Sequence, residues 1–430
     1  MNYYKRTADA LLQDLLDAFG AVLIEGPKWC GKTTTASQLA NSILRMQDPS
    51  MREEYLATAR TKPSILLKGD TPRLIDEWQD APMLWDAVRT TVDDRQIPGQ
   101  FILTGSNAVD KSQIHHSGAG RIARLRMLPM SLWESQESTG EVSLKELFNN
   151  PDYDIDGKMS KMTVEDLIFA ASRGGWPASL LARTPKAQLL VAKNYVQTIC
   201  SDDVSGIDGK KRDAKLTSMI LRAYARNVST LVKKKSLLDD VTSSGEVSCH
   251  VDTFDDYVSA LEKLFVIQNI SAWCPAIRSK TAIRSSVKRC FCDPSIPIAL
   301  LGLSPESLSM QLRTFGFIFE QMCIRDLKAY TIDLNSHVSY YHDRYDLEAD
   351  IVLHLEDGRY ALIECKLGSS EIDEGAKHLL ELKRLIQEHN KTEKQVPIRE
   401  PDLLIVMTGG TMAYSRPDGV KVIPLACFKD

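Results

Sequence analysis

The chain has 430 residues, of which 43% are hydrophobic and 26% are charged, and its formal net charge is −4. A chain of this length exceeds the size at which a single hydrophobic core usually stops growing, so we expect two or three domains. The ordinary composition excludes a disordered chain, and no apolar run approaches the roughly 18 residues of a membrane span.

The start of the chain and its cysteines bear on the compartment. Residues 1–6 lack the apolar core of a secretory signal. Nine cysteines are scattered without a CxxC pair, which is typical of reduced thiols and argues against a zinc site. We therefore expect a cytoplasmic protein without membrane contact. Because the net charge is slightly negative, any binding to nucleic acid would need a local basic patch.

A glycine-rich loop stands between an apolar strand and a helical pattern. Residues 21–25 form an apolar run typical of a buried parallel strand, and apolar residues recur at helical spacing over residues 34–45. The octapeptide between them fits the pattern G-x-x-x-x-G-K-[ST] without a gap: Gly26, Pro27, Lys28, Trp29, Cys30, Gly31, Lys32 and Thr33. Its backbone N–H groups and its lysine suit the phosphates of a nucleotide, and Thr33 suits Mg²⁺. We expect this octapeptide and Thr34 to bind the nucleotide.

Two further strands end in polar residues that suit phosphate chemistry. Residues 73–79 predict a strand that ends in the acidic pair Asp76 and Glu77. We assign Asp76 to Mg²⁺ and Glu77 to the attacking water, and we expect this strand to neighbour the strand before the loop. Residues 101–107 predict a third strand. Its polar end would sense the terminal phosphate through one of three side chains: Thr104, Ser106 or Asn107.

A basic stretch over residues 118–126 follows the third strand. Arg121 is the side chain in it that we expect to stabilise charge in the transition state. It would act either within its own domain or from a neighbouring subunit, which makes oligomerisation a further expectation. A structural salt bridge is an equal alternative for Arg121.

These stretches carry a family resemblance. The segments GPKWCGKT, LIDEWQ, FILTGSN and GRIARLRMLPMSLWE, followed later by RGGWP, resemble the AAA-type ATPases that carry a C-terminal domain of unknown function. The resemblance implies that residues 1–135 form a P-loop domain that binds ATP and Mg²⁺ and hydrolyses ATP. It also implies a helical lid over residues 136–210, in which Arg173 would be a second sensor of the nucleotide.

Helical patterns dominate the middle of the chain. Thr163 is placed to cap a helix over residues 163–171, which ends at the RGGWP turn. Three further helices are predicted over residues 216–231, 236–241 and 253–265. Asp252 would cap the last of these helices. Residues 211–300 resemble the winged-helix segment of the same family, with a wing after the helices.

Two basic clusters in the middle of the chain suit contact with DNA. Residues 210–212 and 233–235 each hold three consecutive lysines or arginines that could bind phosphates. The last predicted helix, however, exposes acidic residues that would repel DNA: Asp252, Asp255, Asp256 and Glu262. We therefore favour a structural or protein-contact role for this segment over DNA recognition.

The C-terminal part, residues 301–430, predicts a helix followed by a hairpin. The helix, over residues 315–329, carries Glu320. Alternating residues 347–355 and the apolar run 360–366 predict two paired strands.

The register of this hairpin decides whether its carboxylates meet. A two-residue turn would leave Asp350 and Glu364 on different faces, because side chains alternate along a strand. A three-residue loop with Gly358 left-handed would place Asp350 opposite Glu364 and Glu348 opposite Lys366. We predict the second register.

In that register Asp350, Glu364 and Lys366 form the pattern D-x(13)-E-x-K, which resembles the PD-(D/E)XK nuclease superfamily. The resemblance implies an α/β nuclease-like domain with Asp350 and Glu364 on a metal ion, Lys366 orienting a water, and Glu320 as a fourth member. The alternative is a cluster of salt bridges on an inactive scaffold of the same fold.

The sequence therefore predicts an α/β protein with an AAA-type P-loop ATPase domain, a helical and winged-helix middle segment and a nuclease-like C-terminal domain. Its expected function is that of an ATP-binding, Mg²⁺-dependent ATPase that acts as a nucleotide-driven switch on its C-terminal domain. The alternative is an ATP-gated DNA-processing enzyme with a metal-dependent nuclease site, and a third hypothesis is ATP binding without hydrolysis. The expected partners are ATP together with either a protein or DNA.

Overall fold

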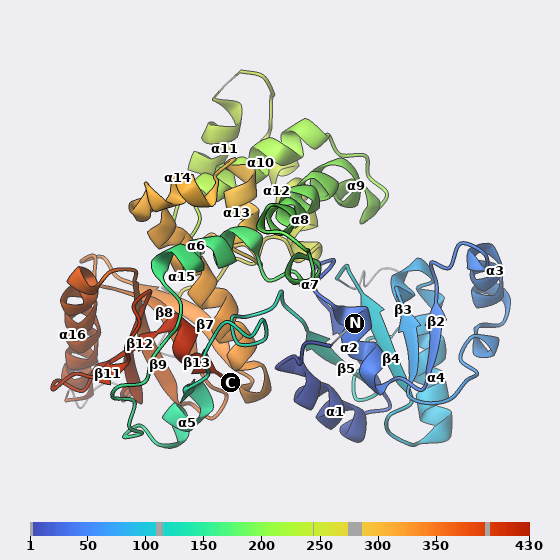
Figure 1. Ribbon diagram of the computed structural model, residues 1–430. Coiled ribbons are helices and arrows are strands. Elements are labelled where there is room, and N and C mark those ends of the chain that lie inside the picture. Colours follow the sequence, from blue (N-terminus) through green and yellow to red (C-terminus); the bar gives the residue numbers. More distant parts are fainter. Residues whose placement is uncertain (1–2, 109–113, 115, 244, 274–285, 392–395) are drawn as a thin grey trace. The chain divides into compact units, whose positions relative to one another are not determined.

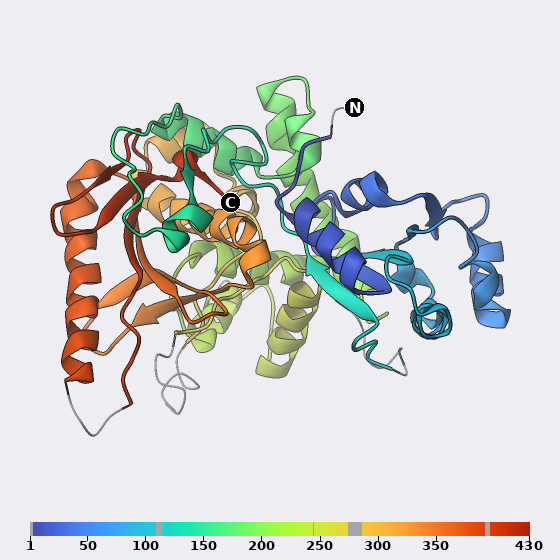
Figure 2. The same cartoon turned by 90° about the horizontal axis from the view of Figure 1, so that it is seen from below.

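The structure is a computed structural model that describes residues 3–108, 114, 116–243, 245–273, 286–391 and 396–430 (Figure 1). It divides the chain into two compact units. Unit 1 comprises Met1–Pro129 with Lys263–Phe265, and unit 2 comprises Met130–Glu262 with Val266–Asp430. Figure 2 shows the elements of both units from below.

Unit 1 is built on a five-stranded sheet with the order β2-β3-β4-β1-β5, and all of its strand pairs are parallel. Its strands are β1 (Ala21–Glu25), β2 (Ser42–Arg45), β3 (Arg73–Asp76), β4 (Phe101–Gly105) and β5 (Ile122–Arg126). Its helices are α1 (Ala8–Ala18), α2 (Lys32–Leu39), α3 (Arg52–Thr61) and α4 (Met83–Arg95), with the 3-10 turns η1 (Pro63–Ile65) and η2 (Trp78–Asp80). The strand that precedes the glycine-rich loop thus lies inside the sheet.

The core of unit 1 follows the alternation of side chains along its strands. Ala21 and Leu23 of β1 and Leu103 of β4 are buried in one cluster with Trp85 and Val88 of α4. Burial of such large apolar side chains stabilises each by roughly 1.5–3 kcal/mol relative to exposure. This packing holds the strands β1 and β4 in place, and with them the loops that follow their carboxyl ends.

Two predictions about unit 1 are wrong. The helix predicted over residues 34–45 ends at Leu39, and Ser42–Arg45 forms the edge strand β2. Ile43 and Leu44 fit helical spacing, but in a short apolar run this spacing also suits a strand, and pairing with β3 decides the outcome. The strand β3 does not neighbour β1, because β4 lies between them.

Unit 2 contains a six-stranded mixed sheet and a group of helices. The sheet has the order β11-β12-β10-β9-β8-β7. Its strands are β7 (His337–His342), β8 (Glu348–His354), β9 (Tyr360–Lys366), β10 (Leu403–Thr408), β11 (Tyr414–Ser415) and β12 (Lys421–Pro424). Pairs β7·β8, β8·β9 and β11·β12 are antiparallel, whereas β9·β10 and β10·β12 are parallel. A separate pair joins β6 (Val142–Ser143) to β13 (Phe428–Lys429).

Long helices cover both faces of this sheet. The helix α16 (Ile372–Asn390) packs its apolar stripe against Leu362 and Val406. The helix α15 (Leu312–Tyr330) lies on the other face, where its Cys323 meets Cys365, the neighbour of Glu364 on β9. Because successive residues of a strand point to opposite faces, Glu364 faces α16.

The other helices of unit 2 belong mostly to the middle of the chain. They are α5 (Leu144–Asn149), α6 (Val164–Arg173), α7 (Pro177–Leu180), α8 (Pro185–Thr198), α9 (Val204–Gly206), α10 (Ala214–Arg226), α11 (Lys234–Thr242), α12 (Val251–Lys263), α13 (Ser295–Leu300) and α14 (Pro305–Ser309). A π-helical turn, η4 (Ile199–Asp203), continues α8, and short 3-10 turns are η6 (Ile332–Leu334), η7 (Ser369–Glu371) and η8 (Leu425–Cys427). The helix labels in Figure 1 follow the order of the sequence.

The predicted helices of the middle segment are present with shifted ends. Thr163 caps α6 through a capping box with Asp166, as predicted from its position. Asp252 does not cap α12, because this helix already begins at Val251 and Asp252 lies in its first turn. After α12 in the sequence, Ile270 and Lys288 form an antiparallel bridge. The wing predicted after the helices lies partly outside the described residues.

The hairpin register predicted for β8 and β9 is confirmed. Ile351 pairs with Ile363, and the register continues to His354 and Tyr360. Gly358 has a φ of +89°, as the three-residue loop requires. The regular pairing ends at Ile351 and Ile363, where the β7–β8 register also shifts, and Asp350 beyond this pair accepts a hydrogen bond from the N–H of Cys365. None of the described helices combines the length and the apolar composition needed to cross a bilayer.

Candidate functional site

The glycine-rich loop runs from the carboxyl end of β1 to the first turn of α2. Gly26 and Gly31 have positive φ values of 154° and 101°, and a Cβ at Gly26 would lie 2.3 Å from the carbonyl oxygen of Met127. Only glycine fits this close approach between two backbones. The two glycines thus let the loop turn into the N-terminus of α2, whose partial positive charge suits an anion.

The side chain of Lys32 folds back over this loop. Its Nζ donates hydrogen bonds to the carbonyl oxygens of Gly26 (2.9 Å) and Pro27 (2.8 Å), and the residue is 5% exposed. This lysine lies within the loop whose sequence pattern is typical of nucleotide phosphate binding. The structure thus supports the role predicted for Lys32.

The residues predicted to hold the metal ion meet directly. The hydroxyl Oγ1 of Thr33 donates to Oδ1 of Asp76 at 2.7 Å, and Oγ1 of Thr104 donates to the same oxygen at 2.6 Å. Hydroxyl and carboxylate oxygens are the hard ligands that Mg²⁺ prefers. The donor set on β3 and α2 therefore fits this ion, although Thr33 and Asp76 lie 43 residues apart in the sequence.

Glu77 is held at the end of β3 by two polar side chains. It adopts a left-handed conformation with a φ of +55°, which is uncommon outside glycine. Its Oε2 accepts hydrogen bonds from Gln79 Nε2 and from Ser106 Oγ, the latter at 3.2 Å. Ser106 was predicted to act here, but Gln79 was missed. Its position two residues after Glu77, in a turn that closes the strand, is the only sequence signal that could have identified it.

Arg121 does not lie near the phosphate loop of its own domain. It directly precedes β5, whose first residue Ile122 pairs with Ala21 at the start of β1. The loop follows Glu25 at the other end of β1, which is five residues or about 16 Å away along the strand. Arg121 instead forms a salt bridge with Asp93 at 2.7 Å.

Arg126 is the basic residue of β5 at the edge that carries the phosphate loop. It pairs in register with Glu25, and its guanidinium lies 3.9 Å from the Glu25 carboxylate. The residue types of the basic stretch 118–126 do not show which end of β5 lies beside the loop. A role for Arg121 within its own domain is therefore wrong.

Arg173 lies in unit 2 and forms a buried ion pair. Its guanidinium donates to both carboxylate oxygens of Glu137, at 3.1 and 2.7 Å, and the residue is only 5% exposed. This bidentate pair anchors the turn at residues 173–177 to the preceding segment. A role of Arg173 as a nucleotide sensor stays a prediction.

The predicted acidic cluster of unit 2 contains a lysine that the sequence analysis missed. Lys288 Nζ forms an ion pair with Glu320 on α15, donates to the carbonyl oxygen of Asp350 at 2.9 Å, and lies 3.8 Å from the Asp350 carboxylate. All three residues are buried. No motif marks Lys288, because it reaches Asp350 across 62 residues from an irregular segment.

Glu364 belongs to a second ion cluster on the face covered by α16. Its Oε2 lies 2.8 Å from Lys366 Nζ, and its Oε1 lies 3.8 Å from Nδ1 of His378. Asp350 turns its Oδ2 to accept a hydrogen bond from the N–H of Cys365 instead. The hairpin thus brings Asp350, Glu364 and Lys366 together as predicted, but each carboxylate has a cationic or backbone partner.

The titration of these groups reflects their burial. Burial raises the pKa of Glu320 to about 8, with Asp350 adding to this shift and Lys288 opposing it. Burial and the charge of Asp350 also raise the pKa of Glu364. The carboxylate of Glu364 raises the pKa of His378 above its ordinary value.

The predicted metal site at Asp350 and Glu364 is not supported. Among the described residues, no group of three or more His, Cys, Asp or Glu side chains is arranged to hold a metal ion. The physical reason is that Glu320 and Glu364 belong to opposite faces of the sheet, and that Lys288 and Lys366 supply positive charge within the protein. The arrangement matches the predicted alternative, a cluster of salt bridges.

Lys210, Arg212 and Lys234, which are half of the residues in the two basic clusters of the middle segment, form ion pairs within unit 2. Arg212 is buried and forms ion pairs with Asp208 (2.7 Å) and Asp256 (2.9 Å). Lys210 pairs with Asp256 and Lys234 pairs with Asp255. These pairs use the acidic residues that were predicted to repel DNA, which supports a structural role for the segment.

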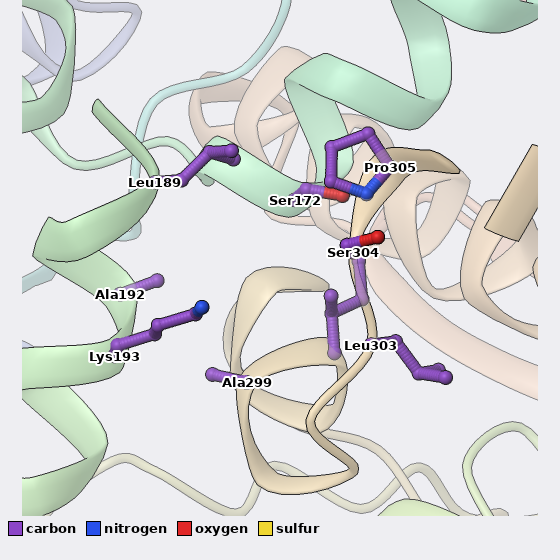
Figure 3. Close-up of a pocket in the computed structure, with 9 residues that line it drawn as sticks. Ser172, Leu189, Ala192, Lys193, Ala299, Leu303, Ser304 and Pro305 are labelled. Carbon is purple, nitrogen blue, oxygen red and sulfur yellow. The ribbon is translucent and has the colours of Figure 1, made fainter. Parts of the chain in front are cut away.

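A small pocket of unit 2 lies between helices α6, α8 and α13 (Figure 3). In Figure 3, Ala192 and Lys193 of α8 face Leu303 and Ser304. The lining is mostly apolar: Ser172, Leu189, Ala192, Lys193, Ile298, Ala299, Leu303, Ser304 and Pro305. None of the predicted site residues lines this pocket.

The strand order, the loop and the acidic strand end together define unit 1 as a P-loop ATPase domain. Comparison with known families agrees, since residues 18–136 match the family described as "AAA domain". Residues 164–307 match "Domain of unknown function (DUF8612)", and residues 315–428 match "Domain of unknown function (DUF4143)". These two matches support neither the predicted winged helix nor the predicted nuclease-like fold.

Similar proteins add no assigned activity. Uncharacterized proteins of Mycobacterium bovis and Mycobacterium tuberculosis are each 24% identical over 366 residues, which is 83% of this chain and 72% of each relative. The Walker-type ATPase PABY2304 of Pyrococcus abyssi is 11% identical, with a TM-score of 0.38 over 70% of this chain and 96% of that one. A structural likeness of this size carries no argument about function.

Proposed function

We propose that the chain is a Mg²⁺-dependent ATPase that acts as a nucleotide-driven switch on its second unit. The observation that carries the proposal is the hydrogen bond of 2.7 Å between Thr33 and Asp76, with Lys32 held above the same loop. A phosphate-binding lysine and two hard-oxygen ligands thus gather at one edge of the sheet. Bound between Thr33 and Asp76, Mg²⁺ would neutralise charge on the phosphates.

The residues at the end of β3 suit hydrolysis as well as binding. Glu77 would take a proton from water as the water oxygen forms a bond to the γ-phosphorus. The bond from this phosphorus to the bridging oxygen then breaks, and ADP and phosphate are released. Ser106, which directly follows the neighbouring strand β4 and contacts Glu77, would link the terminal phosphate to the position of the carboxylate.

The switch is favoured over the alternative of a DNA-processing nuclease. The Lys288 ammonium lies against both Glu320 and Asp350, where a nuclease would need a divalent cation. Lys210, Arg212 and Lys234 of the two basic clusters pair with carboxylates, which reduces the positive charge that this surface offers DNA. A protein partner, contacted by unit 2, therefore suits the chain better than DNA, and a second copy of the chain is one such partner.

The test measures ATP binding and phosphate release by the wild type and three variants. Lys32→Ala should lose ATP binding, whereas Glu77→Gln should bind ATP but release phosphate roughly a hundredfold more slowly or worse. Lys62→Ala, which changes an exposed lysine of unit 1, is the matched control and should behave as the wild type. Binding without phosphate release in the wild type would overturn the ATPase and leave the third hypothesis.

A second assay separates the switch from the nuclease. We expect the wild type to leave single- and double-stranded DNA intact with Mg²⁺ or Mn²⁺, with and without ATP. Cleavage that disappears in Asp350→Ala and depends on Lys32 would instead establish the ATP-gated nuclease.

A further inference from the structure

Buried polar atoms without a partner gather beside Glu77. Among the described residues, Gln79 Oε1, Trp78 Nε1 and Asn107 Oδ1 are buried and form no hydrogen bond. Leaving such a group buried without a partner is unfavourable, so groups of this kind often mark a place where a water or a ligand binds. Two of these atoms, Gln79 Oε1 and Trp78 Nε1, lie against Gly105 at the end of β4, which is the edge of the sheet that carries the phosphate loop.

The amide of Gln79 is satisfied on one side only. Its Nε2 donates to Glu77 Oε2 and lies 3.4 Å from Ser106 Oγ. Its Oε1 accepts no hydrogen bond from the described residues. The amide is thus fixed by the proposed general base, with an acceptor left over beside it.

The neighbouring strand keeps space open for this amide. A Cβ at Gly105 would lie 3.1 Å from Gln79 Oε1 and 3.1 Å from Trp78 Nε1. A larger residue on β4 would therefore press on the unpaired acceptor. Glycine at this strand end leaves the space that the Gln79 amide occupies.

We propose that Gln79 is a further catalytic residue for the ATP hydrolysis on which this inference rests. Its N–H group holds the Glu77 carboxylate, and its Oε1 accepts a hydrogen bond from the water that attacks the γ-phosphate. The water then has two polar partners, Glu77 for one hydrogen and Gln79 for the other, which leaves the lone pairs of its oxygen free to face the phosphorus. Ser106 shares the Glu77 oxygen and completes the arrangement.

The experiment compares steady-state ATP hydrolysis and ATP affinity among four proteins. Gln79→Leu removes both the donor and the acceptor, while Gln79→Glu keeps an acceptor but places a second carboxylate against Glu77. Gln47→Leu is the matched control, because Gln47 is an exposed glutamine of unit 1 whose amide contacts Asp80. We expect kcat to fall about ten- to a hundredfold in both Gln79 variants, with ATP affinity and KM little changed.

The outcomes separate this inference from the proposed function. An active wild type with an equally active Gln79→Leu variant would overturn the inference and leave the ATPase intact. A loss confined to ATP affinity and KM would also overturn it, because Gln79 would then serve binding. A wild type without phosphate release would remove both. If Gln79→Leu does not fold, Gln79→Glu carries the test, since it preserves size and polarity.

Discussion

Lys288 is a single side chain that neutralises charge from two parts of unit 2. It is buried between Glu320 on α15 and Asp350 on β8. The charges of these carboxylates raise the pKa of Lys288 although its burial opposes this shift. The lysine therefore stays charged at neutral pH and holds the two elements together.

Replacing Lys288 with methionine should destabilise unit 2 strongly. The change leaves two carboxylates without their buried counter-ion, which typically costs about 3–5 kcal/mol. Lys145→Met is the control, because Lys145 pairs with Asp333 at the surface and its loss should cost less than about 1 kcal/mol. Urea unfolding of both variants checks the prediction, and equal losses would contradict it.

His378 makes the stability of unit 2 depend on pH. Its pKa is raised in the folded protein by Glu364, although burial opposes the shift. A group with a raised folded pKa contributes stability that is complete below its ordinary value, near 6.5, and is lost as the pH rises through the folded value. The contribution of His378 is therefore largest in mildly acidic solution.

Thermal unfolding of His378→Gln at several pH values tests this dependence. We expect the variant to be less stable than the wild type at pH 6 and to approach it at pH 9. His389→Gln, at the end of the same helix, is the control. A difference between wild type and His378→Gln that grew with pH would show that the sign is wrong.

At the scale of elements, the β8–β9 hairpin depends on one glycine. Gly358 has a φ of +89°, and the three-residue loop it closes sets the register in which Ile351 pairs with Ile363. Gly358→Ala should lower the free energy of unfolding by about 1–2 kcal/mol, because a side chain is strained in this conformation. Gly206→Ala is the control, since Gly206 has open space and no positive φ. Denaturant unfolding would contradict the prediction if both substitutions were neutral.

The elements also show how far sequence patterns reach. The motif around Lys32 and the acidic end of β3 were located from residue types, because the phosphate chemistry admits few alternatives. The hairpin register followed from the alternation of side chains and from one glycine. The helix predicted over residues 34–45 was wrong, because short apolar runs fit two periods and only pairing with β3 decides between them.

Contacts between distant segments could not be predicted in this way. Gln79 and Lys288 carry no motif, and each acquires its role from neighbours that folding brings close. The edge of the sheet on which Arg121 lies likewise depends on strand direction and order, which the sequence does not give. The matches beyond residue 164 have no assigned function, so the identity of the partner stays open to experiment.

At the scale of the whole molecule, the two units should respond differently to ATP. Ligand at a hundred times its Kd stabilises the unit that binds it by about 2.7 kcal/mol. We expect ATP with Mg²⁺ to raise the unfolding temperature of unit 1 in calorimetry, and Lys32→Ala to abolish this shift.

The proposed switch adds a requirement for unit 2. Hydrogen exchange of unit 2 should change when ATP binds unit 1, because coupling requires ATP to favour one state of both units. The Lys32→Ala variant controls for direct effects of ATP. Identical exchange in unit 2 with and without ATP would contradict the switch while leaving the ATPase in place.

The pairing of β6 with β13 has a consequence for dissecting the chain. Phe428 and Lys429 pair with Val142 and Ser143. Ser143 Oγ also donates a hydrogen bond to the carbonyl oxygen of Asp430 at 2.8 Å. A fragment cut between the two C-terminal family matches would lose this closing strand and would also separate Lys288 from its carboxylates. The smallest piece of the second unit worth expressing therefore begins near residue 130 and runs to the end.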